Sequence, residues 1–211
     1  MERRSALALA RAVSAALVLI AILFQVKTNL DAGSFNPTRF FAFFTILSNA
    51  FGMILFFVLA ARRADAHTRT LDVLRGANVV YLTVTFIVVI LLLSGADLQV
   101  AVPWVDFVVH KLFPVIVLVD WLIDPPVGRF TVSDALLWLV YPLGWLGFTL
   151  IRGAADGFYP YPFLNPAHGG YGTVAAYVVA ILVGFLVIAG IVLWLGNRLG
   201  GREKGRRPLT G

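Results

Sequence analysis

The chain has 211 residues, of which 60% are hydrophobic and only 13% are charged, and its formal net charge is +6. Soluble globular chains are about half apolar and about a quarter charged, so this composition excludes an ordinary soluble domain and indicates a helical integral membrane protein. The chain has no cysteine, which excludes disulfides and thiolate chemistry.

Six apolar stretches are long enough to cross the hydrocarbon core, which takes about 20 residues per helix. In chain order they are residues 7–26, 40–61, 76–95, 103–123, 133–151 and 173–196. The first is longer than the apolar core of a signal peptide, so we interpret it as a retained helix. We therefore predict an all-α, polytopic membrane protein with a six-helix transmembrane domain at residues 1–199 and a basic, flexible tail at residues 200–211.

The positive charges predict the direction of these helices. If the six stretches cross in turn, thirteen of the 17 Lys and Arg residues lie on one side, whereas the other side carries Lys27, Arg39 and Arg152. The positive-inside rule then places both termini and the tail in the cytoplasm. Because these charges also meet anionic lipid head groups, we expect the bilayer and a lipid as partners and no nucleic acid. The oligomeric state stays open.

His110 is the first candidate functional residue, because an ionisable group in a lipid-spanning segment costs about 3 kcal/mol on insertion scales unless it meets a partner or a wet cavity. Asp106 precedes it by four residues and shares its helix face, so this carboxylate is a candidate to orient the imidazole. The alternative for Asp106 is an ion pair with a nearby Arg or Lys. Asp120 lies near the cytoplasmic end, where we expect it to pair with an arginine such as Arg129.

A second polar group is predicted at a similar depth on a neighbouring helix. Thr45 and His110 each lie five or six residues into a helix that enters from the outer side, which is roughly 7–9 Å at 1.5 Å per residue. If the two faces meet, a hydroxyl, an imidazole and a carboxylate converge as nucleophile, base and orienter. Ser48 and Asn49 share the Thr45 face and are candidates for oxyanion binding or positioning. The structural alternative for Thr45 is a hydrogen bond to its own backbone carbonyl at i−4.

Three segments resemble a known family. They are Arg39–Asn49, His110–Pro114 followed by Asp120-Trp121, and Tyr159–Asn165 followed by Gly169-Gly170-Tyr171. Their order and placement resemble the bacterial branch of the androgen-induced and androgen-dependent six-helix membrane protein family. The eukaryotic members are intramembrane threonine hydrolases of fatty acid esters of hydroxy fatty acids. The resemblance implies Thr45 as nucleophile, His110 as base, a lipid ester as substrate, no cofactor and a bacterial cytoplasmic (inner) membrane location.

The loop from Gly153 to Gly172 is rich in aromatic residues and is predicted to cap the outer side or to act as a lid. Arg152 and His168 lie beside it, and we expect them to contact the substrate head group. One alternative is a metal hydrolase that uses His110, His168 and a carboxylate such as Asp106 or Asp97, but no ligand-spaced motif is present, so we predict no metal. The other is a non-enzymatic small transporter, proton path or lipid-binding protein.

Overall fold

The computed structural model describes residues 2–62, 67–93 and 102–204, and every regular element in these ranges is helical. The long helices are α1 (Glu2–Asp31), α3 (Phe44–Arg62), α4 (Arg69–Leu92), α7 (Val132–Asp156) and α8 (Gly170–Lys204). Each of these five is long and apolar enough to cross a membrane. The all-α class is therefore confirmed, together with several helices of membrane-spanning length.

The stretch predicted at residues 103–123 is also helical, but it consists of three consecutive elements. These are α5 (Pro103–Phe107), the π-helical turn η2 (Val108–Leu112) and α6 (Phe113–Ile123). A π-turn closes its hydrogen bonds from residue i to residue i+5, and such turns are rare and often found at functional sites. The candidate base His110 lies inside this turn.

The observed helices differ from the predicted spans at their ends. The span expected to begin at residue 40 is preceded by a separate short helix, α2 (Pro37–Phe40), and α3 begins only at Phe44. Asn36 caps α2 by accepting a hydrogen bond from the Arg39 N–H, and Pro37 fixes its first turn. The sequence had suggested that Thr45 lies more than a full turn inside a helix, but the structure places it in the first turn of α3.

Other helices extend beyond the predicted apolar stretch at one or both ends, and capping residues mark their bounds. Thr131 and Asp134 form a capping box at the start of α7, and Gly157, with a φ of 74°, ends the same helix. The helix α8 continues to Lys204, past the predicted start of the tail at residue 200. The rest of that tail, residues 205–211, lies outside the described residues, as do residues 94 and 95 of the third predicted span.

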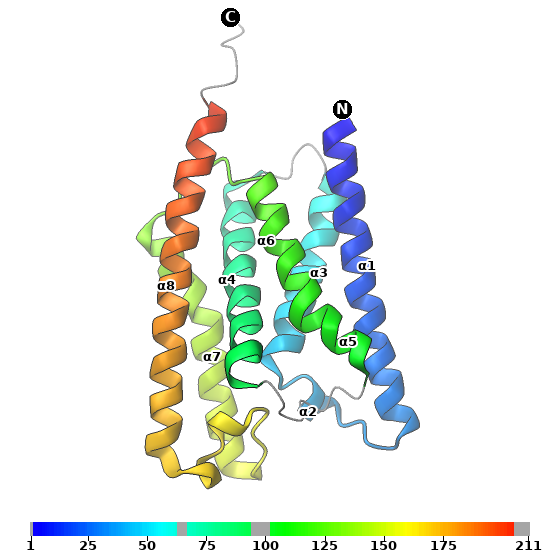
Figure 1. Ribbon diagram of the computed structural model, residues 1–211, viewed down its shortest axis with the longest axis vertical. Coiled ribbons are helices and arrows are strands. Elements are labelled where there is room, and N and C mark those ends of the chain that lie inside the picture. Colours follow the sequence, from blue (N-terminus) through cyan, green and yellow to red (C-terminus); the bar gives the residue numbers. More distant parts are fainter. Residues whose placement is uncertain (1, 63–66, 94–101, 205–211) are drawn as a thin grey trace, which may run out of the picture.

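The long helices form one bundle in which α4 occupies the centre (Figure 1). It packs against α3 and α6 on one side and against α7 and α8 on the other, and α1 packs along α3. The start of α1 and the end of α8 lie at the same end of the bundle, which we call the termini end. The helix α2 and the segment between α7 and α8 lie at the opposite end (Figure 1).

Close packing brings α3, α4 and α6 together where they meet. A Cβ added at Gly52 of α3 would lie 2.8 Å from the Asn78 side chain of α4 and 2.9 Å from the Phe113 ring of α6. Helices in lipid associate through such close approach, because lipid tails are as apolar as Leu and give no hydrophobic drive. Gly52 therefore fixes the spacing between α3, which carries Thr45, and α6, which directly follows the turn that carries His110.

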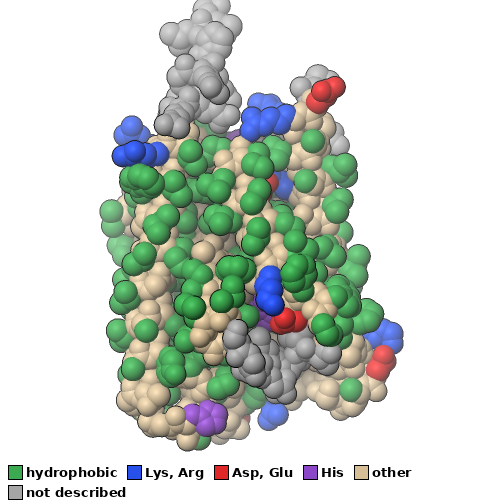
Figure 2. Space-filling model, in the orientation of Figure 1, with side chains coloured by type: hydrophobic (Ala, Val, Ile, Leu, Met, Phe, Trp, Pro, Cys, Tyr) green, Lys and Arg blue, Asp and Glu red, His purple; other side chains and the backbone are tan. Residues whose placement is uncertain are grey.

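The outside of the bundle is mostly apolar. Figure 2 shows hydrophobic side chains over the middle of one face and most Lys and Arg side chains toward its two ends. On α7, Val140 and Ile151 leave 64% and 75% of their surface exposed, although both are strongly apolar. Such a surface suits contact with lipid, which agrees with an integral membrane protein.

Candidate functional site

His110 is buried, with 4% of its surface exposed, and is held by a carboxylate. Its Nδ1 lies 2.7 Å from Oδ1 of Asp106, one helical turn earlier in α5. Asp106 is only partly buried, so the pair reaches from the interior toward the surface of the bundle. With Nδ1 engaged by the carboxylate, Nε2 is the ring nitrogen left to exchange a proton with another group.

The π-turn that carries His110 has a local cause in the backbone. The Phe113 N–H bonds to the carbonyl of Val108, five residues earlier, and Pro114 has no N–H to donate. The Val109 carbonyl is thus left without the donors that a helix normally supplies. Asn49 on α3 fills this gap by donating from Nδ2 to the Val109 oxygen at 3.0 Å.

Asn49 therefore positions the site. Its second amide hydrogen is donated to the Thr45 carbonyl at 2.8 Å, so both hydrogens of the side chain are used. This leaves no amide hydrogen to bind an oxyanion. Of the two roles suggested for Asn49, positioning and oxyanion binding, the contacts therefore favour positioning. Ser48 is fully buried and does not line the cavity described below, so its hydroxyl does not reach that space.

Thr45 is buried to 4% exposure and meets a tyrosine from a distant part of the chain. Its Oγ1 lies 3.2 Å from the Tyr161 hydroxyl, and its N–H donates to the same oxygen at 3.3 Å. Thr28 and Thr85 instead donate to their own helix carbonyls at i−4. Thr45 has no helical carbonyl at that position because it is the second residue of α3.

Thr45 and His110 open into one cavity of about 130 Å³ near the opposite end of the bundle. The helices α1, α3 and the α5–η2 run supply most of its wall, and Tyr161 closes another part. Polar side chains from Gln25, Asn29 and Arg39 also face this space. No hydrogen bond joins Thr45 directly to His110 among the described residues, and both side chains line the same space.

Arg152 and His168 do not reach this cavity. The Arg152 guanidinium donates to the Thr38 carbonyl at 2.6 Å and pairs with Asp156 at 3.0 Å. His168 is exposed, with Nδ1 3.3 Å from the Pro162 carbonyl. The cation at the cavity wall is Arg39, whose guanidinium carbon lies 5.0 Å from the centre of the Phe158 ring.

Tyr161 and Arg39 are the residues that sequence reasoning missed. Tyr161 precedes the short 3₁₀ turn η3 (Pro162–Leu164), which is followed by η4 (Pro166–His168). Its ring stacks on Phe163 at 5.3 Å and meets Phe43 edge-on at 5.6 Å, which fixes the hydroxyl beside Thr45. Burial raises the pKa of Tyr161, so it remains a neutral phenol. The Tyr-Pro-Tyr-Pro pattern of the loop was the available signal.

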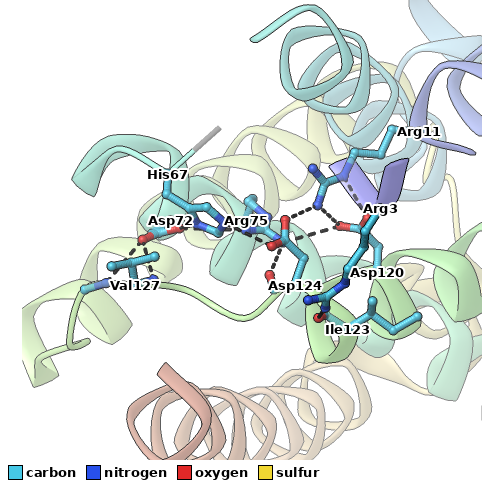
Figure 3. A network of polar contacts seen from close by, with 10 residues as sticks. Arg3, Arg11, His67, Asp72, Arg75, Asp120, Ile123, Asp124 and Val127 are labelled. Atoms are coloured by element: carbon cyan, nitrogen blue, oxygen red, sulfur yellow. Dashed lines mark hydrogen bonds and ion pairs between the residues drawn. The ribbon is translucent and has the colours of Figure 1, made fainter. Parts of the chain in front are cut away.

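A second polar cluster joins α1, α4 and α6 at the termini end (Figure 3). Arg11 pairs with Asp120 at 2.7 Å and with Asp124 at 2.5 Å, and Arg75 lies 3.4 Å from Asp120. Asp120 thus pairs with arginine as expected, but the partners are Arg11 and Arg75 and not Arg129, because it faces α1 and α4. The guanidinium groups come from neighbouring helices, so the cluster ties the bundle together.

His67 completes this cluster between two carboxylates. Its Nε2 lies 3.0 Å from Asp124 and its Nδ1 lies 3.1 Å from Asp72. These hydrogen bonds, to Asp124 first and to Asp72 second, raise the pKa of His67 to about 9. Burial raises the pKa of Asp124, but the hydrogen bond from His67 and the charge of Arg75 outweigh it and hold that pKa below its usual range. The imidazole is therefore charged at neutral pH.

No group of three or more His, Cys, Asp or Glu residues is placed to hold a metal ion within residues 2–62, 67–93 and 102–204. His110 lies in the cavity and His168 on the surface, so they do not converge as the metal alternative requires. Asp97, the other carboxylate considered for such a site, lies outside the described residues.

Comparison of the chain with protein-family models, with curated proteins and with solved structures finds no match in any of the three.

Proposed function

We propose that the protein is a six-span enzyme of a bacterial inner membrane that hydrolyses a lipid ester with Thr45 as nucleophile and His110 as base. Both termini face the cytoplasm, so the Thr45 cavity lies in the outer half of the bilayer. The distribution of Lys and Arg supports this orientation. The family resemblance of the segments around Thr45 and His110 supports the chemistry.

The observation that carries the proposal is the shared cavity. Two buried polar side chains, a hydroxyl on α3 and a carboxylate-bound imidazole in η2, line the same space of about 130 Å³. A nucleophile, a base and an orienting group are the parts that ester hydrolysis through an acyl-enzyme needs. Asp106 acts as the orienter in this reading, since its contact with Nδ1 fixes the tautomer of His110.

The reaction proceeds in two halves. His110 Nε2 takes the hydroxyl proton while Thr45 Oγ1 forms a bond to the ester carbonyl carbon. The carbon–oxygen bond to the alcohol then breaks, and His110 returns the proton to the departing alkoxide. Water enters the cavity, loses a proton to His110 and attacks the acyl carbon. The bond between that carbon and Thr45 Oγ1 then breaks, which releases a fatty acid, and His110 returns its proton to Oγ1.

The first turn of α3 supplies donors for the negative charge on the carbonyl oxygen. The first N–H groups of a helix have no acceptor within the helix, and the helix dipole favours negative charge there. Ile46 follows the nucleophile and lines the cavity, so its N–H is the donor we assign to the oxyanion. A main-chain N–H next to the nucleophile has the same role in other hydrolases.

Arg39 is assigned to the head group of the substrate. It lines the cavity near the opposite end of the bundle and stacks on Phe158. A guanidinium at that place suits a carboxylate or phosphate at the lipid surface. Arg39 replaces Arg152 and His168 in this role, because the Arg152 guanidinium donates to the Thr38 carbonyl and His168 lies on the surface.

Labelling with a fluorophosphonate probe tests the proposal. Wild-type protein in detergent is expected to be labelled, and the Thr45→Ala and His110→Ala variants are expected to lose the label. Thr149→Ala is the matched control, because Thr149 is as deeply buried, at 3% exposure, but does not line the cavity. Equal labelling of wild type and Thr45→Ala, or none in either, would reject the hydrolase and favour a lipid-binding or transport role.

A further inference from the structure

We infer that the first carbons of the substrate's acyl chain bind in a second, apolar cavity that shares Thr45 and Tyr161 with the first. This inference rests on the proposed hydrolase function and assigns a place to the acyl part of its lipid ester. The second cavity measures about 120 Å³ and lies between α4, α7 and α8. Its wall includes Val88, Leu143, Leu146, Val178 and Ile181.

The second cavity offers nothing to a polar ligand. The Thr85 hydroxyl at its wall donates to the Tyr81 carbonyl at 3.0 Å, and the Trp145 indole N–H donates to the Ala42 carbonyl at 2.9 Å. The remaining hydroxyls, of Thr45 and Tyr161, contact each other. Apolar cavities of roughly this size stay dry and take apolar guests. The lining therefore suits a hydrocarbon chain.

The reaction itself decides which part of the substrate enters each cavity. His110 lines only the first cavity, and it must deliver a proton to the departing alkoxide. The alcohol portion of the ester therefore lies in the first cavity, together with the water of the second half-reaction. The acyl chain extends from the same carbonyl carbon in another direction. The second cavity is the other space beside Thr45, so we place the acyl chain there.

Selection in this cavity comes from shape. A lipid tail gains little by moving from the bilayer into an apolar pocket, because both surroundings are equally apolar. A chain that fits beside Tyr161 brings its carbonyl carbon to Thr45 Oγ1, whereas a chain that does not fit holds the carbonyl away. Filling the cavity should therefore lower turnover of long acyl esters and spare short ones.

Two substitutions on α8 form a matched test. Val178 lines the second cavity, whereas the adjacent Val179 is 59% exposed on the lipid-facing side. We expect Val178→Phe to lower kcat/KM for p-nitrophenyl laurate by about tenfold or more and to change that for p-nitrophenyl acetate by less than about twofold. Val179→Phe should leave both values unchanged. An equal loss with the two esters in Val178→Phe, or no loss with either, would overturn the acyl pocket.

A photoreactive fatty acid separates this inference from the hydrolase proposal. A palmitate that carries a diazirine in its chain should label peptides of α4 and α8 in wild type and equally in Thr45→Ala, because binding does not need the nucleophile. The label should be lost in Val178→Phe and kept in Val179→Phe. A wild type that is labelled but cleaves neither ester would reject the hydrolase and keep the pocket. Equal labelling of the two valine variants would reject the pocket.

Discussion

The side-chain amide of Asn49 on α3 donates a hydrogen bond to the main-chain carbonyl of Val109 in η2, with Nδ2 and O 3.0 Å apart. The same amide donates to the carbonyl of Thr45. One side chain thus links the helix of the proposed nucleophile to the turn of the proposed base. The Val109 carbonyl would otherwise be buried without a donor, because the π-turn diverts the Phe113 N–H and Pro114 has none, and this gives the contact its energetic weight.

Replacing Asn49 with Ala should therefore destabilise the bundle. The Val109 carbonyl left unsatisfied costs about 1–3 kcal/mol, so we expect the free energy of unfolding to fall by roughly that amount. Denaturant unfolding in detergent measures this loss. Ser48→Ala is the neighbouring control, because the buried Ser48 hydroxyl has no hydrogen-bond partner among the described residues. An Asn49→Ala variant as stable as Ser48→Ala would refute the linking role.

Pro114 should matter for activity more than for stability. Pro114→Ala restores an N–H in the first turn of α6 and lets the π-turn relax toward an ordinary helix, which shifts His110 relative to Asn49 and Thr45. We expect ester hydrolysis to fall at least about tenfold while the thermal midpoint stays at or above that of wild type. Pro103→Ala, at the first position of α5, is the control. Wild-type activity in Pro114→Ala would show that the π-turn has no part in catalysis.

Removing the Tyr161 hydroxyl should reduce kcat without unfolding the protein. Tyr161→Phe keeps the ring packed against Phe43 and Phe163 but frees Thr45 from the group that holds it. A nucleophile that loses its fixed position is expected to lower kcat by about 10- to 100-fold and to leave KM nearly unchanged. Steady-state kinetics with a soluble ester measure kcat and KM for Tyr161→Phe and for the control Tyr171→Phe, whose ring is exposed. If KM rises while kcat holds, Tyr161 binds substrate and does not position Thr45.

The cluster around His67 predicts a loss of stability in alkaline solution. Its folded-state pKa of about 9 lies above the unfolded value of 6.5, so its stabilising contribution is complete below pH 6.5 and is lost as the pH rises through 9. At 1.36 kcal/mol per pKa unit, the contribution is about 3 kcal/mol at most. Thermal midpoints between pH 6 and pH 10 measure it, and His67→Gln should flatten the profile. An equally steep profile in His67→Gln would exclude His67 as its source.

The sequence predicts the helices well and the contacts between them poorly. Apolar length alone locates each long helix, because a lipid-facing helix is apolar over most of its surface. The break between α2 and α3 escapes this reasoning, since Phe40–Phe44 is as apolar as a helix interior. Asn36 and Pro37, which form the cap and first turn of α2, were the local signals of that break.

The site follows from the sequence only in part. Thr45, His110 and Asp106 can be proposed from residue type, spacing and resemblance, and the structure brings the first two to one cavity. The pairing of Thr45 with Tyr161 spans 116 residues, and that of Arg11 with Asp120 spans 109. No local pattern reports contacts at such separations, because they depend on how the helices are arranged in the bundle.

The ionic cluster at the termini end also determines where the bundle can flex. Parting two buried charged groups there costs several kcal/mol, whereas apolar helix surfaces can exchange a protein neighbour for a lipid tail at little cost. The helices α1, α4 and α6 are thus held together by buried ion pairs at the termini end. Under the proposed function, a fatty acid made at Thr45 would leave at the other end of the bundle, away from these ion pairs and directly into the leaflet that supplied the ester.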